Sequence, residues 1–220
     1  MLEIVFPKNN DVRSRRIVTR SRARPTGKYP SWKMGRMIEW ESSNELNAYR
    51  LLDATPTVQR YQEQPLMLRY VIDGERHIHY PDVYVEARDS RELWEIKPLA
   101  QALQPEIAAR TRLLVQGLPE LGFTYRMVLA EELSRQPRLG TAMQLLKHGR
   151  TPVNADDRER VRQLLNRTQV VTWIFAEQGG LGPSGRQTLA RLTLEGFLQI
   201  DMDRPLTSET CFSISAEKQR

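Results

Sequence analysis

The order of predicted elements between residues 42 and 130 constrains the fold of this chain more than any other feature. One helix precedes three β-rich segments, and a second helix is followed by one more β-rich segment. Alternation of helices and strands on this scale is typical of α/β domains. The sequence therefore predicts an α/β domain in which a mixed sheet is flanked by helices.

Local signals place these elements. Ser42 and Glu45 have the spacing of a capping box, and Pro56 ends the helix that follows. The β-rich segments are residues 66–72, 77–87 and 92–97, and Asp73-Gly74 predicts a hairpin turn between the first two. Pro81 interrupts the second segment, which indicates an edge or a bulge there.

The second helix is predicted between Pro105 and Gly117, and the last strand of this region at residues 125–130. Beyond residue 133 the predictions are helices near 142–147, 156–165 and 184–195, short strands at 197–202 and 210–215, and either state for 169–177. Helices followed by a two-stranded ribbon indicate a winged-helix module. We expect three parts: a basic arm (1–36), an α/β domain (37–133) and a winged-helix-like domain (134–220).

The N-terminal arm is strongly basic. Against Glu3 and Asp11 it carries ten basic residues: Lys8, Arg13, Arg15, Arg16, Arg20, Arg22, Arg24, Lys28, Lys33 and Arg36. The chain as a whole has a net charge of +6 and a pI near 9.7. Such a segment is unsuited to a core and is expected to lie along a phosphate backbone or to remain a solvated tail.

Other features exclude several classes of protein. The single cysteine rules out an intramolecular disulfide framework and a multi-cysteine zinc site. No apolar run is long enough for a membrane span, and the N-terminus lacks the apolar region of a secretory signal. We therefore expect an intracellular protein that does not bind membranes.

Three side chains predict a hydrolytic site. On a strand, Glu95 and Lys97 point to the same face, and Asp82 joins them if its strand is the neighbour. Two carboxylates at one place need a counter-charge, which Mg²⁺ or Mn²⁺ supplies, and a lysine beside them can orient a water. The pattern predicts metal-assisted phosphodiester hydrolysis. The alternative is a set of cross-strand ion pairs on a solvated face.

Two further sets of residues are candidates for the site. Glu45 lies just before the sheet and is a candidate third carboxylate, although the capping box uses the same side chain. His77 and His79 are two apart on a strand. With only His148 remaining, they do not make a complete metal site.

Several motifs together resemble the N-terminal domain of TnsA endonucleases, a branch of the PD-(D/E)XK restriction-endonuclease-like nucleases. The motifs are Ser42 to Glu45, Leu51-Leu52, Thr55 to Val58, Glu63-Gln64-Pro65, Pro81-Asp82-Val83 and Glu95-Ile96-Lys97-Pro98. Residues 189–202 and 211–214 resemble the winged-helix-like C-terminal domain of the same family more weakly.

The resemblance implies a function. It implies Glu45, Asp82 and Glu95 as ligands of Mg²⁺ or Mn²⁺ and Lys97 as the catalytic lysine. It also implies cleavage of double-stranded DNA at the 5′ ends of a transposon. The partners would be a DDE transposase and an AAA+ regulator, in the cytoplasm and associated with the nucleoid. Two alternatives stay open: a stand-alone phage or defence nuclease, and a non-catalytic DNA-binding or assembly module of the same fold.

Overall fold

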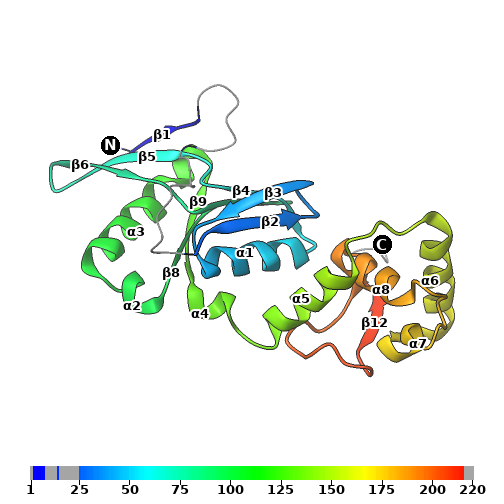
Figure 1. The fold of residues 1–220 in the computed structure, drawn as a ribbon. Helices are drawn as coiled ribbons and strands as arrows, with labels where there is room; N and C mark the ends of the chain where they lie inside the picture. Colours follow the sequence, from blue (N-terminus) through cyan, green and yellow to red (C-terminus); the bar gives the residue numbers. More distant parts are fainter. Residues whose placement is uncertain (1, 8–13, 15–24, 216–220) are drawn as a thin grey trace. The chain divides into compact units, whose positions relative to one another are not determined.

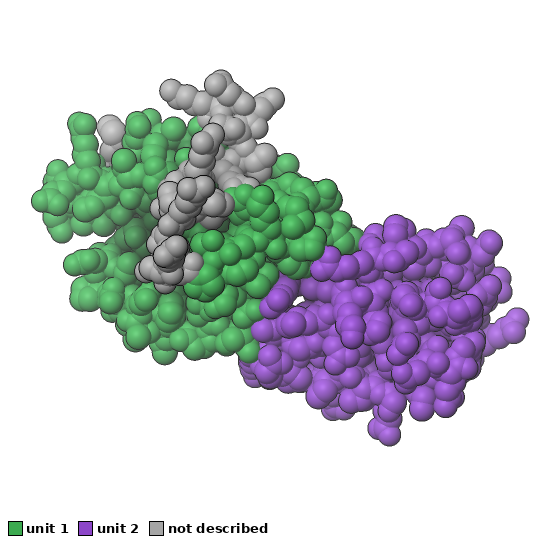
Figure 2. Space-filling view, in the orientation of Figure 1, with its two compact units in different colours: residues 1–49, 58–134 green, residues 50–57, 135–220 purple. Residues whose placement is uncertain are grey.

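The structure is a computed structural model that describes residues 2–7, 14 and 25–215 of the 220-residue chain (Figure 1). The chain divides into two compact units, shown in different colours in Figure 2. The first comprises residues 1–49 and 58–134, and the second comprises residues 50–57 and 135–220. The first unit contains the predicted α/β elements.

A four-stranded mixed sheet forms the centre of the first unit. Its strand order is β4-β7-β8-β9, with antiparallel pairing except between β8 and β9, which run parallel. The strands are β4 (Val58–Glu63), β7 (Val83–Ala87), β8 (Arg91–Lys97) and β9 (Thr124–Leu129). The predicted α/β fold with a mixed sheet is confirmed, and the arrangement is consistent with a restriction-endonuclease-like fold.

Helices flank this sheet. Tyr49 of α1 stacks on Tyr61 of β4, with ring centroids 5.7 Å apart. Tyr61 pairs with Val85, so the adjacent Tyr84 points to the opposite face, where it shares a buried cluster with Leu114 of α3. The helices of this unit are α1 (Ser43–Ala54), which continues into the second unit, α2 (Leu99–Ala102), α3 (Pro105–Gly117), α4 (Ala130–Leu133) and a 3₁₀ turn (Pro119–Leu121).

Two smaller sheets accompany the central one. One has the order β1-β5-β6 and the other pairs β2 with β3. Their strands are β1 (Leu2–Val5), β5 (Met67–Ile72), β6 (Glu75–His79), β2 (Gly27–Ser31) and β3 (Arg36–Trp40). Asp73 and Gly74 both have positive φ, at 51° and 82°, which confirms the predicted hairpin turn between β5 and β6.

The prediction of a basic arm over residues 1–36 is wrong at both ends of that segment. Leu2–Val5 pairs with β5, and Gly27–Ser31 pairs with β3. Tyr29 of β2 is buried. The apolar residues near the two ends of the segment are sufficient for short strands. Most of the arginines on which the prediction rested lie in 8–13 and 15–24, outside the described residues.

The single strand predicted over residues 77–87 is also wrong. The segment contains the end of β6 and all of β7, which belong to different sheets. Pro81 has no N–H to donate to a ladder, so the chain leaves one sheet before it and enters the other after it. This break places Asp82 at the start of β7.

The second unit combines four helices with short strands in the order β10-β12-β11. Residues 169–177, which the sequence leaves open, form a short strand and then α7. The elements are α5 (Arg138–His148), α6 (Ala155–Thr168), β10 (Val171–Thr172), α7 (Trp173–Glu177), α8 (Gly185–Leu194), β11 (Leu198–Gln199) and β12 (Cys211–Ile214). The winged-helix assignment of this region stays a prediction.

Candidate active site

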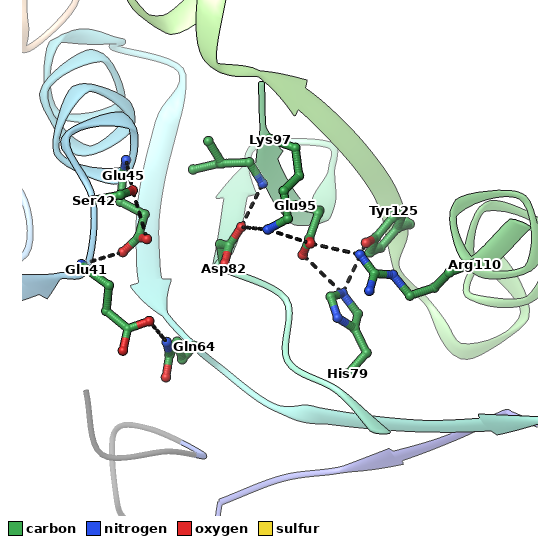
Figure 3. Close-up of polar contacts among 11 residues, drawn as sticks. Glu41, Ser42, Glu45, Gln64, His79, Asp82, Glu95, Lys97, Arg110 and Tyr125 are labelled. Atoms are coloured by element: carbon green, nitrogen blue, oxygen red, sulfur yellow. Dashed lines mark hydrogen bonds and ion pairs between the residues drawn. The ribbon is translucent and has the colours of Figure 1, made fainter. Parts of the chain in front are cut away.

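Asp82, Glu95 and Lys97 meet at one end of the central sheet, as the strand pattern predicts (Figure 3). Lys97 Nζ lies 2.9 Å from Glu95 Oε1 and 3.9 Å from Asp82 Oδ2. The Glu95 side chain is only 3% exposed. The alternative of ion pairs on a solvated face therefore does not describe this cluster.

The backbone fixes Asp82 against the strand that carries the other two residues. Asp82 N donates to the Trp94 carbonyl at 2.9 Å, and Ile96 N donates to Asp82 Oδ2 at 2.7 Å. The donor of the second bond, Ile96, lies between Glu95 and Lys97 on β8. Asp82 is therefore held by main-chain groups of β8, which set its distance from Lys97.

Three further residues lie at or next to Glu95. Arg110 Nη2 of α3 donates to Glu95 Oε1 at 2.9 Å. His79 Nε2 of β6 lies 3.2 Å from Glu95 Oε2 and 3.1 Å from the Tyr125 hydroxyl of β9. No spacing or motif in the sequence relates these positions to Glu95. His79 is a candidate in the sequence only as half of a histidine pair, and His77 instead stacks on Tyr70.

The cluster perturbs the ionisation of its acids in opposite directions. Burial, and then the charge of Glu95, raise the pKa of Asp82 above its ordinary value. Burial also raises the pKa of Glu95, but the contacts with His79 and Lys97 outweigh it and leave that pKa below the ordinary value. Burial lowers the pKa of His79 although Glu95 opposes this. The two carboxylates thus compete for one ammonium group.

Ser42 makes the hydrogen bond to Glu45 N that the predicted capping box requires, and the Glu45 carboxylate accepts from the backbone of the neighbouring Glu41. Glu45 N donates to Ser42 Oγ at 3.2 Å, and Ser42 Oγ donates to Glu45 Oε1 at 3.0 Å. Glu41 N donates to Glu45 Oε2 at 2.9 Å. Burial raises the pKa of Glu45, and the charge of Lys97 acts in the other direction. The charge of Glu45 also raises the pKa of Asp82, so Glu45 acts electrostatically on the cluster.

Gln64 lies between the capping box and Asp82. Its side-chain Nε2 donates to Glu41 Oε2 at 3.3 Å, and its backbone N donates to the Asp82 carbonyl at 2.9 Å. Gln64 has a φ of 40°, which is strained for a residue other than glycine, and strain of this kind concentrates at functional sites. It connects the start of α1 with the start of β7.

The donor set of this cluster fits a divalent cation. Asp82 and Glu95 are two carboxylates that share the single ammonium of Lys97, and burial, followed by the charge of Glu95, raises the pKa of Asp82. Glu95 Oε2 is buried and accepts no hydrogen bond of good geometry from the described residues, although His79 Nε2 is near. Mg²⁺ needs only one or two carboxylates, with water and phosphate oxygens completing its shell. Within the described ranges no group of three or more His, Cys, Asp or Glu side chains is placed to hold a metal ion, so the protein itself would supply only the two carboxylates.

A comparison with protein families identifies this region. Residues 55–128 match the family described as "TnsA-like endonuclease N terminal". The chain contains a TnsA-like endonuclease domain. The match covers about a third of the chain and includes Asp82, Glu95 and Lys97, whereas Glu45 lies before it. The matched family is described as an endonuclease domain, and endonucleases are hydrolases.

Other comparisons add little. No curated protein matches the chain. Among solved structures, the crystal structure of protein VC1899 from Vibrio cholerae is 13% identical, with a TM-score of 0.28. The similarity covers 55% of this chain and 26% of that protein, so the TnsA-like chain spans about a quarter of its length. In the part of the chain that the structure describes, no helix has the length and apolar character needed to cross a membrane.

Proposed function

We propose that this protein is a metal-dependent DNA endonuclease that cuts the 5′ ends of a transposon together with a DDE transposase. The observation that carries the proposal is the convergence of Asp82, Glu95 and Lys97 inside the TnsA-like region. Double-stranded DNA is the proposed substrate class, because it is the one that the resemblance to TnsA endonucleases implies. An AAA+ regulator that controls the pair, and a site of action at the bacterial nucleoid, belong to the same proposal.

In this mechanism Asp82 and Glu95 hold a divalent cation, Mg²⁺ or Mn²⁺, and Glu45 adds a third carboxylate nearby. The bound cation supplies Lewis-acid polarisation of the phosphate and a more acidic water. Lys97 orients the attacking water and stabilises the negative charge that develops on phosphate. The Lys97 side chain is 27% exposed, so Lys97 is accessible to a substrate while it remains beside Glu95.

The second unit would serve assembly. We propose that residues 134–220 form a winged-helix-like domain that contacts the regulator rather than DNA. Arg186 and Arg191 of α8 support this, because each is paired with a glutamate of the same unit, Glu177 and Glu195. Deletion of residues 140–220 should weaken binding of the regulator, and an unchanged affinity would contradict this assignment.

The test of the catalytic proposal is cleavage of transposon-end DNA by the full chain with its cognate transposase and Mg²⁺. Asp82→Ala and Lys97→Ala should each abolish 5′-end cleavage. Asp89→Ala, in the exposed turn before β8, is a matched control that should cut like the wild type. Wild-type rates for the two site variants would refute the assignment. Cleavage that needs no transposase would favour a stand-alone phage or defence nuclease.

One observation favours a non-catalytic role. Both Glu45 oxygens accept hydrogen bonds of the capping box, and Lys97 already neutralises part of the charge of Asp82 and Glu95. A DNA-binding or assembly module that keeps the nuclease fold would show these contacts too. Calorimetry separates the two functions, because only the nuclease should bind Mg²⁺ or Mn²⁺ in a way that depends on Asp82.

A further inference from the structure

On the side away from Asp82, Arg110 and His79 contact the Glu95 carboxylate, and Tyr125 contacts His79 (Figure 3). Arg110 comes from α3, His79 from β6 and Tyr125 from β9. β6 belongs to a different sheet from β8 and β9. The carboxylate is therefore contacted both from a helix and from another sheet, in addition to Lys97 on its own strand.

Burial shows that Arg110 serves Glu95 rather than solvent or a phosphate backbone. The Arg110 side chain is 17% exposed, and the carboxylate that it contacts is 3% exposed. Its Nε is buried and has no hydrogen-bond partner among the described residues. Burying a guanidinium this deeply is costly unless a carboxylate compensates it, and Glu95 is the carboxylate that it contacts. Arg112, two residues along the same helix, is exposed.

His79 lies beside the other oxygen of Glu95. It is 7% exposed, and its Nε2 lies between Glu95 Oε2 and the Tyr125 hydroxyl. Its ring packs edge-on against Tyr125, with centroids 6.0 Å apart, which restricts rotation of the imidazole. Glu95 therefore has Arg110 at Oε1 and His79 at Oε2, and neither contact involves Asp82.

We propose that Arg110 and His79 are positioning residues that fix Glu95 for metal binding. The inference rests on the proposed metal site. Lys97 and Arg110 both contact Glu95 Oε1. If Lys97 moved towards the substrate, Glu95 would be free to rotate unless Arg110 and His79 held it in place. Outer groups that orient a metal ligand typically contribute about 10–100-fold to metal affinity.

Isothermal titration of Mn²⁺ into the full chain, well below its melting temperature, tests this inference. Arg110→Gln should weaken Mn²⁺ binding about 10–100-fold, and His79→Phe, which keeps a ring of similar size, should weaken it in the same direction. Arg112→Gln is the matched control and should bind like the wild type. Arg110→Lys keeps the positive charge and should recover part of the affinity. If Arg110→Gln fails to fold, Arg110→Lys and His79→Phe together still test the inference.

An Mn²⁺ affinity that is unchanged or tighter in folded Arg110 and His79 variants would overturn the inference, because a purely structural ion pair does not affect binding to folded protein. Asp82→Ala distinguishes this failure from failure of the proposed function. If the wild type binds Mn²⁺ only through Asp82 and the variants bind equally well, the positioning role is wrong and the metal site stands. If the wild type binds no Mn²⁺, both the metal site and the positioning role are wrong.

Discussion

The two roles of Glu45, as a helix cap and as a carboxylate of the site, can be separated by two substitutions. Ser42→Ala removes the hydroxyl that accepts from Glu45 N at 3.2 Å and donates to Glu45 Oε1 at 3.0 Å, but it keeps the carboxylate. Glu45→Gln removes the charge, while its amide oxygen can still accept from Glu41 N. Glutamine is the other residue that a capping box uses at this position.

The expected magnitudes follow from these contacts. Loss of a serine cap costs about 1 kcal/mol. Unfolding entropy for a unit of about 130 residues is roughly 270 cal/mol/K, so this cost lowers the melting temperature by about 4 °C. Glu45→Gln should change the stability by less than about 0.5 kcal/mol, because the helix keeps a hydrogen-bonding side chain there.

Scanning calorimetry and the cleavage assay read the two roles in parallel. We expect Ser42→Ala to melt earlier and still cut DNA, and Glu45→Gln to melt like the wild type and lose cleavage. A Ser42→Ala protein as stable as the wild type would show that the cap contributes nothing. Wild-type cleavage by Glu45→Gln would remove Glu45 from the proposed site.

Substitutions at three more positions test individual features of the fold. Gln64→Gly should be more stable than Gln64→Ala by about 1 kcal/mol in urea unfolding, because only glycine accepts a φ of 40° without strain; equal stabilities would contradict this. Burial raises the pKa of Glu195, but Arg191 and Arg158 outweigh it, so the folded pKa is depressed. The wild type should therefore be more stable than Glu195→Gln above about pH 4.3, and this difference should vanish as the pH falls through the depressed pKa of Glu195. A stability difference that does not depend on pH would refute this linkage. Gly149→Ala should cost about 1–3 kcal/mol, because its Cβ would lie 2.9 Å from the backbone of α8, and an unchanged melting temperature would show that α5 and α8 can separate.

Local signals predict much of the fold. The capping box and Pro56 give α1, and Pro105 and Gly117 give both ends of α3, since these residues act through their own backbone geometry. β4 is missed because Val58–Glu63 is mostly polar and carries no alternation strong enough to mark a strand. The pairing of β1 with β5 is a long-range contact, which no local pattern encodes.

The candidate site is predictable only in part for the same reason. Glu95 and Lys97 are two apart on one strand, so the pleat alone brings them together, and Asp82 joins them through the neighbouring strand. Arg110 reaches Glu95 from a helix fifteen residues later. His79 reaches Glu95 from another sheet, because the chain leaves the sheet of β6 before Pro81 and enters the central sheet after it. Tertiary packing alone determines both contacts.

The central claim is that Asp82 and Glu95 together bind a divalent cation beside Lys97. Anomalous X-ray diffraction from crystals of the full chain grown with Mn²⁺ measures this directly. The account predicts an Mn²⁺ ion bonded to oxygens of both carboxylates at about 2.1 Å, with Lys97 next to it. An ion bound elsewhere, or none at this cluster when Mn²⁺ is saturating, would contradict the account.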